Sequence, residues 1–285
     1  MSMISRRSFL KAGGVLAAMS AGAGRLAART LKLPIGLQLY SVKDFLAKDF
    51  DGTLAKVRAA GYTEVEAAGY YNRTAAEFRQ AMDRAGLHCV STHHGMGLLL
   101  KKLDELIEYG HNLGLEYIIC PSPVRRDPTL TGALTLDDWR WVAGEFNRMG
   151  EKVKAAGMTF GYHNHTEEFG NEGGVVFYDE LMRLTDPKLV VFEMDCGWVF
   201  AGGRDPAQYL RKTPERFPLL HVKDIMKGAD GVFHSPLLGR GSVDNRAILR
   251  AATGLKHYFV EQEEYDMEPF EALRLDAEYM RKLRF

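Results

Sequence analysis

The segment GYHNHTEEF, residues 161–169, places two histidines one residue apart, directly after an apolar run. His163 and His165 share a face if this segment is a strand, because side chains alternate along β-structure. Imidazoles and carboxylates are common ligands of divalent metals such as zinc and manganese. A single histidine at such a place is more often a hydrogen-bonded core residue, so the interpretation depends on which other side chains lie nearby.

Polar residues of the same kinds lie at the ends of most other apolar runs. They are Gln38, Tyr40, Glu66, His93, His94, Glu193, Asp195, His221, Lys223, Glu261 and Glu263. The last four runs of the chain each offer a histidine or a carboxylate, and burying such groups without partners would cost several kcal/mol each. A divalent metal held by two imidazoles and two carboxylates would remove that cost, and the mixed set suits Mn, Zn, Co or Fe better than Mg or Ca.

Eight short apolar runs alternate with amphipathic stretches, and each run is short enough to be a strand. The runs span residues 33–41, 62–69, 87–94, 115–122, 158–165, 189–196, 217–224 and 257–264. Helices are expected at 51–61, 74–86, 101–114 and 135–157, three of them ending in glycine after alanine. This repeat predicts an α/β fold, a (β/α)8 TIM barrel whose catalytic face lies at the carboxyl ends of the strands. A doubly wound open sheet is the structural alternative.

Six motifs carry a resemblance to a known family. GLQLYS, GYHNHTEEF, FEMDCGW, LLHVKD, LGRGSVD and FVEQEEYD resemble the sugar phosphate isomerase/epimerase family with the xylose isomerase-like TIM barrel, over roughly residues 33–283. The resemblance implies one divalent metal, and among the metals that suit the mixed ligand set we expect Mn, Zn or Co. Its expected ligands are His163, Asp195, His221 and Glu261.

We expect further roles around this metal. Glu261 would accept a proton, Lys223 would hold the developing oxyanion, and His165 would touch the substrate. The expected substrate-binding residues are Gln38, Glu66, His93, Glu168 and Trp198. His165 shares the face of His163 and is therefore the rival metal ligand on this strand.

Two positions depart from the best-known sugar epimerases of the family. Those enzymes have a glutamate where His163 stands and often a histidine where Trp198 stands. Proton exchange between two glutamates is therefore not expected here. One metal and one carboxylate still suit enolisation of a sugar carbonyl, followed by isomerisation, epimerisation or loss of a β-substituent, with 3-keto-glycosides among the substrates considered.

Two other functions are compatible with the same barrel. One is a non-catalytic periplasmic barrel that binds a sugar or a metal. The other is an endonuclease-type metal hydrolase, which would need a basic face for DNA. No HExxH, Walker loop or GxSxG motif is present, so no motif supports a zincin, NTPase or serine-hydrolase activity.

The first residues have the composition of an export leader. SRRSFLK is followed by a weakly apolar stretch and by RLAAR, and no acidic residue occurs before Asp44. The paired Arg6 and Arg7 resemble the twin-arginine type. We therefore expect a leader over 1–29, cleaved near Ala27–Arg29, a catalytic barrel over 30–285, and a periplasmic location.

The net charge limits the kinds of molecule that the chain can bind. The leader holds five of the 37 basic residues, so the remainder has 32 against 37 acidic residues, a net charge near −5. This gives no support to nucleic acid as a partner, and no segment is apolar enough to span a membrane. A small carbohydrate is the expected partner, and a homodimer is left open.

Cys89, Cys120 and Cys196 are expected to be buried rather than paired.

Overall fold

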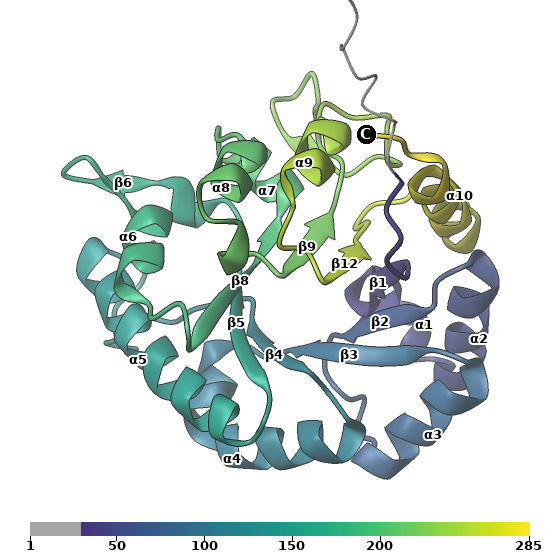
Figure 1. The fold of residues 1–285 in the computed structure, drawn as a ribbon, viewed down its shortest axis with the longest axis horizontal. Helices are drawn as coiled ribbons and strands as arrows, with labels where there is room; N and C mark the ends of the chain where they lie inside the picture. The colour runs from purple at the N-terminus through teal and green to yellow at the C-terminus, as the bar shows by residue number, and fades with distance from the viewer. Residues whose placement is uncertain (1–29) are drawn as a thin grey trace, which may run out of the picture.

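Eight parallel strands close into a barrel surrounded by helices (Figure 1). The computed structural model describes residues 30–285. The barrel strands are β1 (Gly36–Gln38), β2 (Glu64–Ala67), β3 (His88–His93), β4 (Tyr117–Cys120), β5 (Thr159–His163), β8 (Val190–Asp195), β9 (Leu219–Val222) and β12 (His257–Val260). All eight fall within the predicted runs, so the TIM barrel is confirmed. The predicted leader lies outside the described residues.

The strand order places the metal-ligand candidates side by side. Around the barrel the order is β1, β12, β9, β8, β5, β4, β3 and β2, and β1 closes the ring by pairing with β12. The strands that carry or precede the four candidates, β5, β8, β9 and β12, are therefore consecutive. Because all strands are parallel, their carboxyl ends meet at one end of the barrel.

Ten helices are found among the described residues, most of them on the outside of the barrel. They are α1 (Lys43–Leu46), α2 (Phe50–Ala60), α3 (Ala75–Ala85), α4 (Met96–Leu113), α5 (Leu136–Ala155), α6 (Phe177–Leu184), α7 (Cys196–Ala201), α8 (Pro206–Lys212), α9 (Asn245–Ala251) and α10 (Pro269–Lys282). Short 3₁₀ turns occupy Leu39–Val42, Glu167–Phe169 and Pro214–Arg216.

Local sequence signals begin and end the predicted helices. Thr74 and Thr135 each form a capping box, with Glu77 and Asp138 respectively, at the starts of α3 and α5. Gly61 ends α2 in the left-handed region, with φ of 109°. Helix α4 starts earlier than the predicted 101–114, because a kink at Lys102 joins a short first segment to the amphipathic one.

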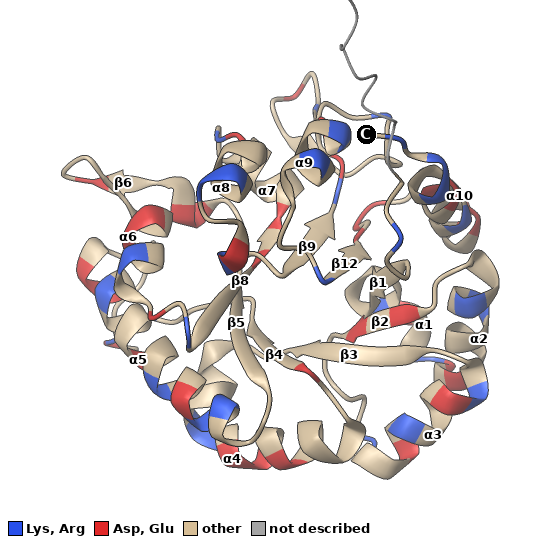
Figure 2. Ribbon diagram, viewed as in Figure 1, with Lys and Arg blue, Asp and Glu red and all other residues tan. Residues whose placement is uncertain are grey.

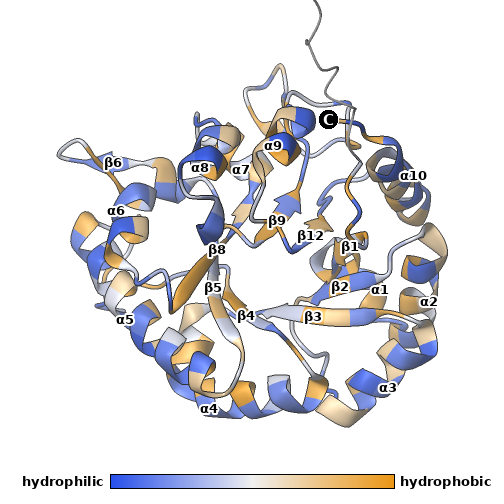
Figure 3. Ribbon diagram, viewed as in Figure 1, coloured by the Kyte–Doolittle hydropathy of each residue, from blue (hydrophilic) through white to orange (hydrophobic). Residues whose placement is uncertain are grey.

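The helices present an apolar side to the strands and a charged side to solvent. Figure 3 shows hydrophobic and hydrophilic residues alternating along each outer helix. Figure 2 shows basic and acidic residues interspersed along α2 to α5. None of the helices within residues 30–285 is long and apolar enough to cross a membrane. Cys89, Cys120 and Cys196 are buried and unpaired, as expected.

A second apolar cluster fills the barrel interior below the polar residues. It consists of Val90, Tyr117, Ile119, Leu219 and Phe259. Since strand side chains alternate, the residues two positions after Leu219 and Phe259 also point inward, one layer higher. Those residues are His221 and Glu261, so the packed layer supports the polar layer from below.

Several elements were not predicted. Two short antiparallel pairs, β6 (Asn171–Glu172) with β7 (Val175–Val176) and β10 (Met226–Lys227) with β11 (Phe233–His234), lie in the segments after β5 and β9. Strands of two residues are too short to show a period in the sequence. Helix α7 begins directly at the end of β8, because the Asp195 side chain accepts a hydrogen bond from Trp198 N and caps it.

Candidate metal centre

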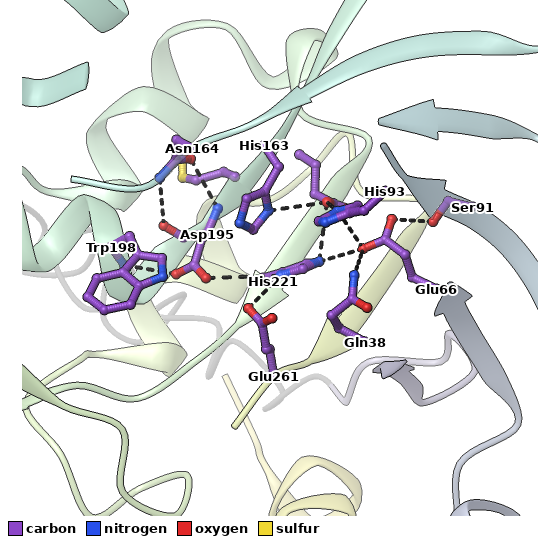
Figure 4. A network of polar contacts seen from close by, with 12 residues as sticks. Gln38, Glu66, Ser91, His93, His163, Asn164, Asp195, Trp198, His221 and Glu261 are labelled. Carbon is purple, nitrogen blue, oxygen red and sulfur yellow. Dashed lines mark hydrogen bonds and ion pairs between the residues drawn. The ribbon is translucent and has the colours of Figure 1, made fainter. Parts of the chain in front are cut away.

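Four buried side chains from consecutive strands converge at the carboxyl end of the barrel. His163 and Asp195 end β5 and β8, His221 lies in β9, and Glu261 directly follows β12. Each offers one ligand atom, and these atoms lie within 4.8 Å of one another. Figure 4 shows the side chains pointing toward a common centre. This is the set that the sequence assigned to a metal.

Two atoms of this set lack hydrogen-bond partners although they are buried. They are His163 Nδ1 and Asp195 Oδ2. Their nearest charged groups are Glu193 Oε2, 3.2 Å from His163 Nδ1, and the Lys223 ammonium group, 3.2 Å from Asp195 Oδ2. A buried polar atom without a hydrogen bond costs about 1–3 kcal/mol, and a divalent cation between the two atoms would satisfy both. A mixed imidazole and carboxylate set also has the chemistry that Zn, Mn or Co prefers. The residues present therefore fit a divalent metal.

The backbone around Asp195 is held in place by Asn164. Asp195 N donates to Asn164 Oδ1 at 3.1 Å, and Asn164 Nδ2 donates to Asp195 O at 3.3 Å. Asp195 Oδ1 accepts from Trp198 N at 2.8 Å. These bonds leave Oδ2 as the carboxylate oxygen that faces the centre.

The pKa shifts agree with a ligand role for His163 and Glu261. Burial, with His221 and His93 adding to it, lowers the pKa of His163 well below its usual value, so its imidazole is neutral. Burial opposes ionisation of Glu261, but Lys223 and His221 hold its pKa well below the usual value. Neutral histidine and ionised carboxylate are the forms that bind metals.

The pKa shifts of the other two candidates run in the opposite direction. Burial lowers the pKa of His221, but Glu193 and Glu261 raise it well above the usual value, and burial raises the pKa of Asp195.

Lys223 lies next to both carboxylates of the set. Its side chain is fully buried, with Nζ 2.9 Å from Glu261 Oε2 and 3.2 Å from Asp195 Oδ2, and it also pairs with Glu263. Nζ lies over the Trp198 ring, 4.7 Å from its centroid. Burial works against the charge, but the surrounding carboxylates raise the Lys223 pKa, so the ammonium group stays charged.

A second polar layer is built around Glu66. Its carboxylate accepts from Gln38 Nε2 at 2.6 Å and from Ser91, and it pairs with His93 and with His221, whose Nε2 lies at 2.7 Å. Glu66 therefore links two other predicted substrate-binding residues, Gln38 and His93, to the metal-ligand candidate His221. Their contact with substrate stays a prediction.

Glu193 belongs to the same network, and the sequence assigned it no role. It lies 2.7 Å from His93 Nε2 and 3.2 Å from His221 Nε2. Burial opposes its charge, yet the two histidines lower its pKa to about 2. His93 in turn has a pKa raised to about 9, because Glu66 and Glu193 outweigh its burial. The available signal was the alternation of Glu193 with Asp195, which placed both on one face.

An alternative ligand set shares two residues with the first. His93, His163, Glu193 and His221 also offer ligand atoms within 4.8 Å of one another. In this set Glu193 Oε2 already contacts His93, His163 and His221. The second set offers a single carboxylate to balance the charge of a divalent cation, whereas the first offers two. The first set is therefore the better candidate. His165 belongs to neither set.

The remaining predicted residues lie just after β5 and β8, with His165 and Glu168 following β5 and Trp198 in α7. The His165 ring is half-buried, with its centroid 5.1 Å from that of His163 and 6.3 Å from that of Trp198. Glu168 is buried, accepts from the Tyr162 hydroxyl, and accepts from His165 N at 3.0 Å. In this position Glu168 orients His165, and its expected contact with substrate stays a prediction.

Asp224 organises the loop after β9, a role that was not predicted from the sequence. Its carboxylate accepts hydrogen bonds from the backbone of Gly239, Gly241 and Val243, at 2.8, 3.0 and 3.1 Å. A side chain on Gly241 would meet Asp224 Oδ1 at 2.1 Å, so this close approach requires glycine. The motif LGRGSVD thus folds around the residue that follows Lys223.

Comparisons with known proteins agree with this architecture. Residues 54–283 match the family model described as xylose isomerase-like TIM barrel. A solved sugar phosphate isomerase/epimerase from Parabacteroides distasonis is 30% identical with a TM-score of 0.73, over 87% of this chain and 98% of that chain. A solved IOLI protein with a bound zinc atom is 11% identical with a TM-score of 0.67, over 86% of this chain and 96% of that chain, which shows the fold alone.

Curated relatives of this chain are named inosose dehydratase. The protein of Geobacillus thermodenitrificans is 24% identical over 279 residues, 82% of this chain and 89% of its own length. The match to the Geobacillus kaustophilus protein spans 62% of that protein. Residues 3–23 match the signal sequence of the TAT (twin-arginine translocation) pathway. The predicted twin-arginine export, typically to the periplasm, is thereby confirmed, and the boundary at residue 29 stays a prediction.

Proposed function

We propose that this chain, which belongs to the xylose isomerase-like TIM barrel family, is a divalent-metal-dependent enzyme that removes a proton beside a sugar carbonyl. The observation that supports it best is the set His163, Asp195, His221 and Glu261, with two buried ligand atoms that no hydrogen bond satisfies. The names of the relatives support a sugar as substrate.

The metal would be held by these four residues. When bound, it would supply a Lewis acid that polarises the carbonyl and stabilises negative charge on its oxygen. Mn, Zn or Co fits the mixed donor set. Zinc is present in a structural neighbour of the same fold.

Glu261 is proposed as the proton acceptor. Burial opposes ionisation of Glu261, but Lys223 and His221 hold its pKa well below the usual value, so the carboxylate is ionised, the form that can accept a proton. Lys223 lies 2.9 Å from it and would hold the developing oxyanion. His165, half-buried beside Trp198, would contact sugar hydroxyls.

The proton taken by Glu261 has two destinations. Returned to carbon, it completes an isomerisation or an epimerisation. Passed to a β-hydroxyl group, it lets that group depart as water while the electron pair of the enolate forms a double bond. Epimerisation by exchange between two carboxylates would need a second glutamate, and His163 stands at the position where the best-known epimerases have it. Elimination and isomerisation need only one carboxylate base. The dehydratase name of the curated relatives favours elimination.

Export limits the substrate. A protein that works outside the cytoplasm meets free sugars and glycosides more readily than sugar phosphates, and we propose keto-sugars, 3-keto-glycosides among them, as the class to examine. The proposed catalytic domain spans residues 30–285.

One experiment tests the function. The protein is purified without chelator, its metal content is measured, and keto-sugars and 3-keto-glycosides are supplied in deuterated water. Deuterium at the carbon beside the carbonyl, or loss of a β-substituent, is the expected result, and a chelator should stop it. Metal and sugar binding without exchange or loss of any group would instead identify a binding protein.

A further inference from the structure

The exposed large apolar side chains of the described chain lie at one end of the barrel. Single exposed apolar residues are normal on a protein surface, so their placement, rather than their number, needs an explanation. Within residues 30–285 every one lies between the carboxyl end of a barrel strand and the first five residues of the helix that follows. They are Tyr40, Leu98, Leu100, Leu130, Met226, Val232 and Met267.

Four of them follow three neighbouring strands. Tyr40 follows β1, Met226 and Val232 belong to the segment after β9, and Met267 follows β12. Their exposed fractions are 44%, 44%, 53% and 38%. The strand order β1, β12, β9 places these three connections next to one another (Figure 1). We call these four residues the apolar wall.

Hydrogen bonds join the three connections that carry the wall. Gln262 N donates to Ser41 Oγ at 3.1 Å, and the Tyr265 hydroxyl donates to Ser41 O at 2.9 Å. His234, the cross-strand partner of Met226, lies 2.9 Å from Glu264 through Nδ1. The wall is therefore built on a connected set of loops.

The same three strands lead directly from the candidate metal centre to the wall. Glu261 immediately precedes the loop that holds Met267, and Lys223 lies three residues before Met226. Gln38 Oε1 accepts from Tyr40 N at 3.0 Å, while the ammonium group of Lys43 lies 3.5 Å from the centroid of the Tyr40 ring. The charged groups of the centre are buried, whereas the side chains of the apolar wall on the connecting loops are exposed.

A ligand that matches both regions needs a polar part and an apolar part. A free monosaccharide would satisfy the charged centre and leave the wall exposed to water. A sugar linked to an aryl or alkyl group would bury part of that wall, and burial of apolar surface contributes about 25 cal/mol per Å².

We propose that the apolar wall binds the apolar aglycone of a glycoside whose sugar ring lies at the candidate metal centre. This rests on the proposed function, because it takes the sugar to bind beside Glu261 and Lys223. It narrows the substrate class from sugars in general to glycosides with an aryl or alkyl aglycone.

Calorimetric titration of the metal-loaded protein with methyl and phenyl β-D-glucopyranoside tests the proposal. The phenyl glucoside should bind about tenfold more tightly, given the area that one ring can bury. The double variant Tyr40→Ser, Met267→Ser should bring its affinity down to that of the methyl glucoside. Leu98→Ser changes an equally exposed residue after β3 and should keep the tenfold difference.

Several results would overturn the wall as an aglycone site. They are equal affinity for the two glucosides, no binding of the phenyl glucoside, or a tenfold difference that persists in the double variant. Deuterium exchange into keto-sugars is measured separately. Deuterium exchange together with equal affinities for the two glucosides would exclude the aglycone site and leave the proposed function standing. Absence of deuterium exchange would exclude the proposed function.

The rival occupant of the wall is a second copy of the chain. The mass in solution, measured by light scattering for the unchanged protein and for Met226→Ser, Val232→Ser, separates the two. Equal masses support the aglycone site. A dimer that the two substitutions dissociate would make the wall an interface between copies and overturn the proposal.

Discussion

The Lys223 ammonium group lies 2.9 Å from Glu261 Oε2 and 3.2 Å from Asp195 Oδ2, so one buried cation contacts two of the four metal-ligand candidates. Glu263 pairs with it from the solvent side. A cation held beside two ligands opposes the binding of a second cation. The same cation is suited to stabilise an oxyanion that forms next to the metal.

Replacing Lys223 separates these two effects. Lys223→Met should bind Mn or Zn at least as tightly as the unchanged protein, because a competing positive charge is gone. Deuterium exchange beside the carbonyl should fall about 100-fold or more, since removing one donor to an oxyanion costs roughly that much. Lys256→Met, an exposed lysine outside the site, is the control. Full exchange in Lys223→Met would exclude the oxyanion role.

The metal ligands are tested by single substitutions followed by metal analysis. Asp195→Ala and His221→Ala should each lose bound metal and activity together, as should His163→Ala. Glu261→Gln should retain more metal, because an amide oxygen can still bind, but it should lose proton exchange.

The fifth strand needs its own comparison. Metal lost in His165→Ala but kept in His163→Ala would reassign the ligand on β5. Stoichiometric metal with normal turnover in Asp195→Ala or His221→Ala would remove the metal-site hypothesis altogether.

The sequence predicted the barrel and the ends of its strands because each strand lies in a short apolar run, and most of these runs carry polar residues near their ends. The alternation of side chains along strands predicted that His221 and Glu261 point toward the barrel axis, and the structure adds the apolar layer of Leu219 and Phe259 below them. Capping residues and glycine placed three of the four predicted helices to within two residues. These are local signals, and local signals can be read from one sequence.

The partners of each polar residue could not be predicted in this way. Glu193 pairs with His93 across 100 positions of the chain, and Glu66 pairs with His221 across 155. Such contacts depend on barrel closure and strand register, which no local pattern contains. The pair β6 and β7 and the pair β10 and β11 were not predicted, because a strand of two residues is too short to show the alternation of apolar and polar residues.

Trp198 is expected to contact the sugar. Its ring lies beneath the Lys223 ammonium group, and its buried indole Nε1 has no hydrogen-bond partner, so a substrate hydroxyl could accept from it. Trp198→Ala should raise the KM for the sugar about tenfold with a smaller effect on thermal stability. Trp198→Phe keeps the ring without the N–H group and should raise the KM less. A large loss of stability with unchanged KM would instead make Trp198 a core residue.

The export signal depends on its paired arginines. Changing Arg6 and Arg7 to lysine should keep the protein in the cytoplasm, because the pair is the feature that defines the twin-arginine type. Fractionation of cells followed by immunoblotting measures this. Lys11→Arg, which leaves the pair intact, should be exported normally. Unchanged periplasmic yield of the double lysine variant would count against twin-arginine export.

Asp276 should make the stability of the barrel depend on pH. This residue of α10 is buried, its Oδ1 accepts from Leu238 N at 2.8 Å, and its Oδ2 has no partner. Burial raises its pKa to about 7; the Leu238 bond lowers the pKa and Asp224 raises it further. In the unfolded chain an aspartate has a pKa of about 3.9.

Between these two values the folded state binds a proton that the unfolded state does not. The contribution of Asp276 is therefore fully present below about pH 3.9 and is lost as pH rises through about 7. Three pKa units correspond to about 4 kcal/mol, an upper figure for this group. Asp276→Asn cannot ionise, so its free energy of unfolding relative to the unchanged protein should rise from about pH 4 to about pH 7 and level off above that. Denaturant titrations at each pH measure this difference. Asp83→Asn, on the exposed side of α3, should give a flat difference over the same range, and a flat difference for Asp276→Asn would show that the buried carboxyl keeps an ordinary pKa.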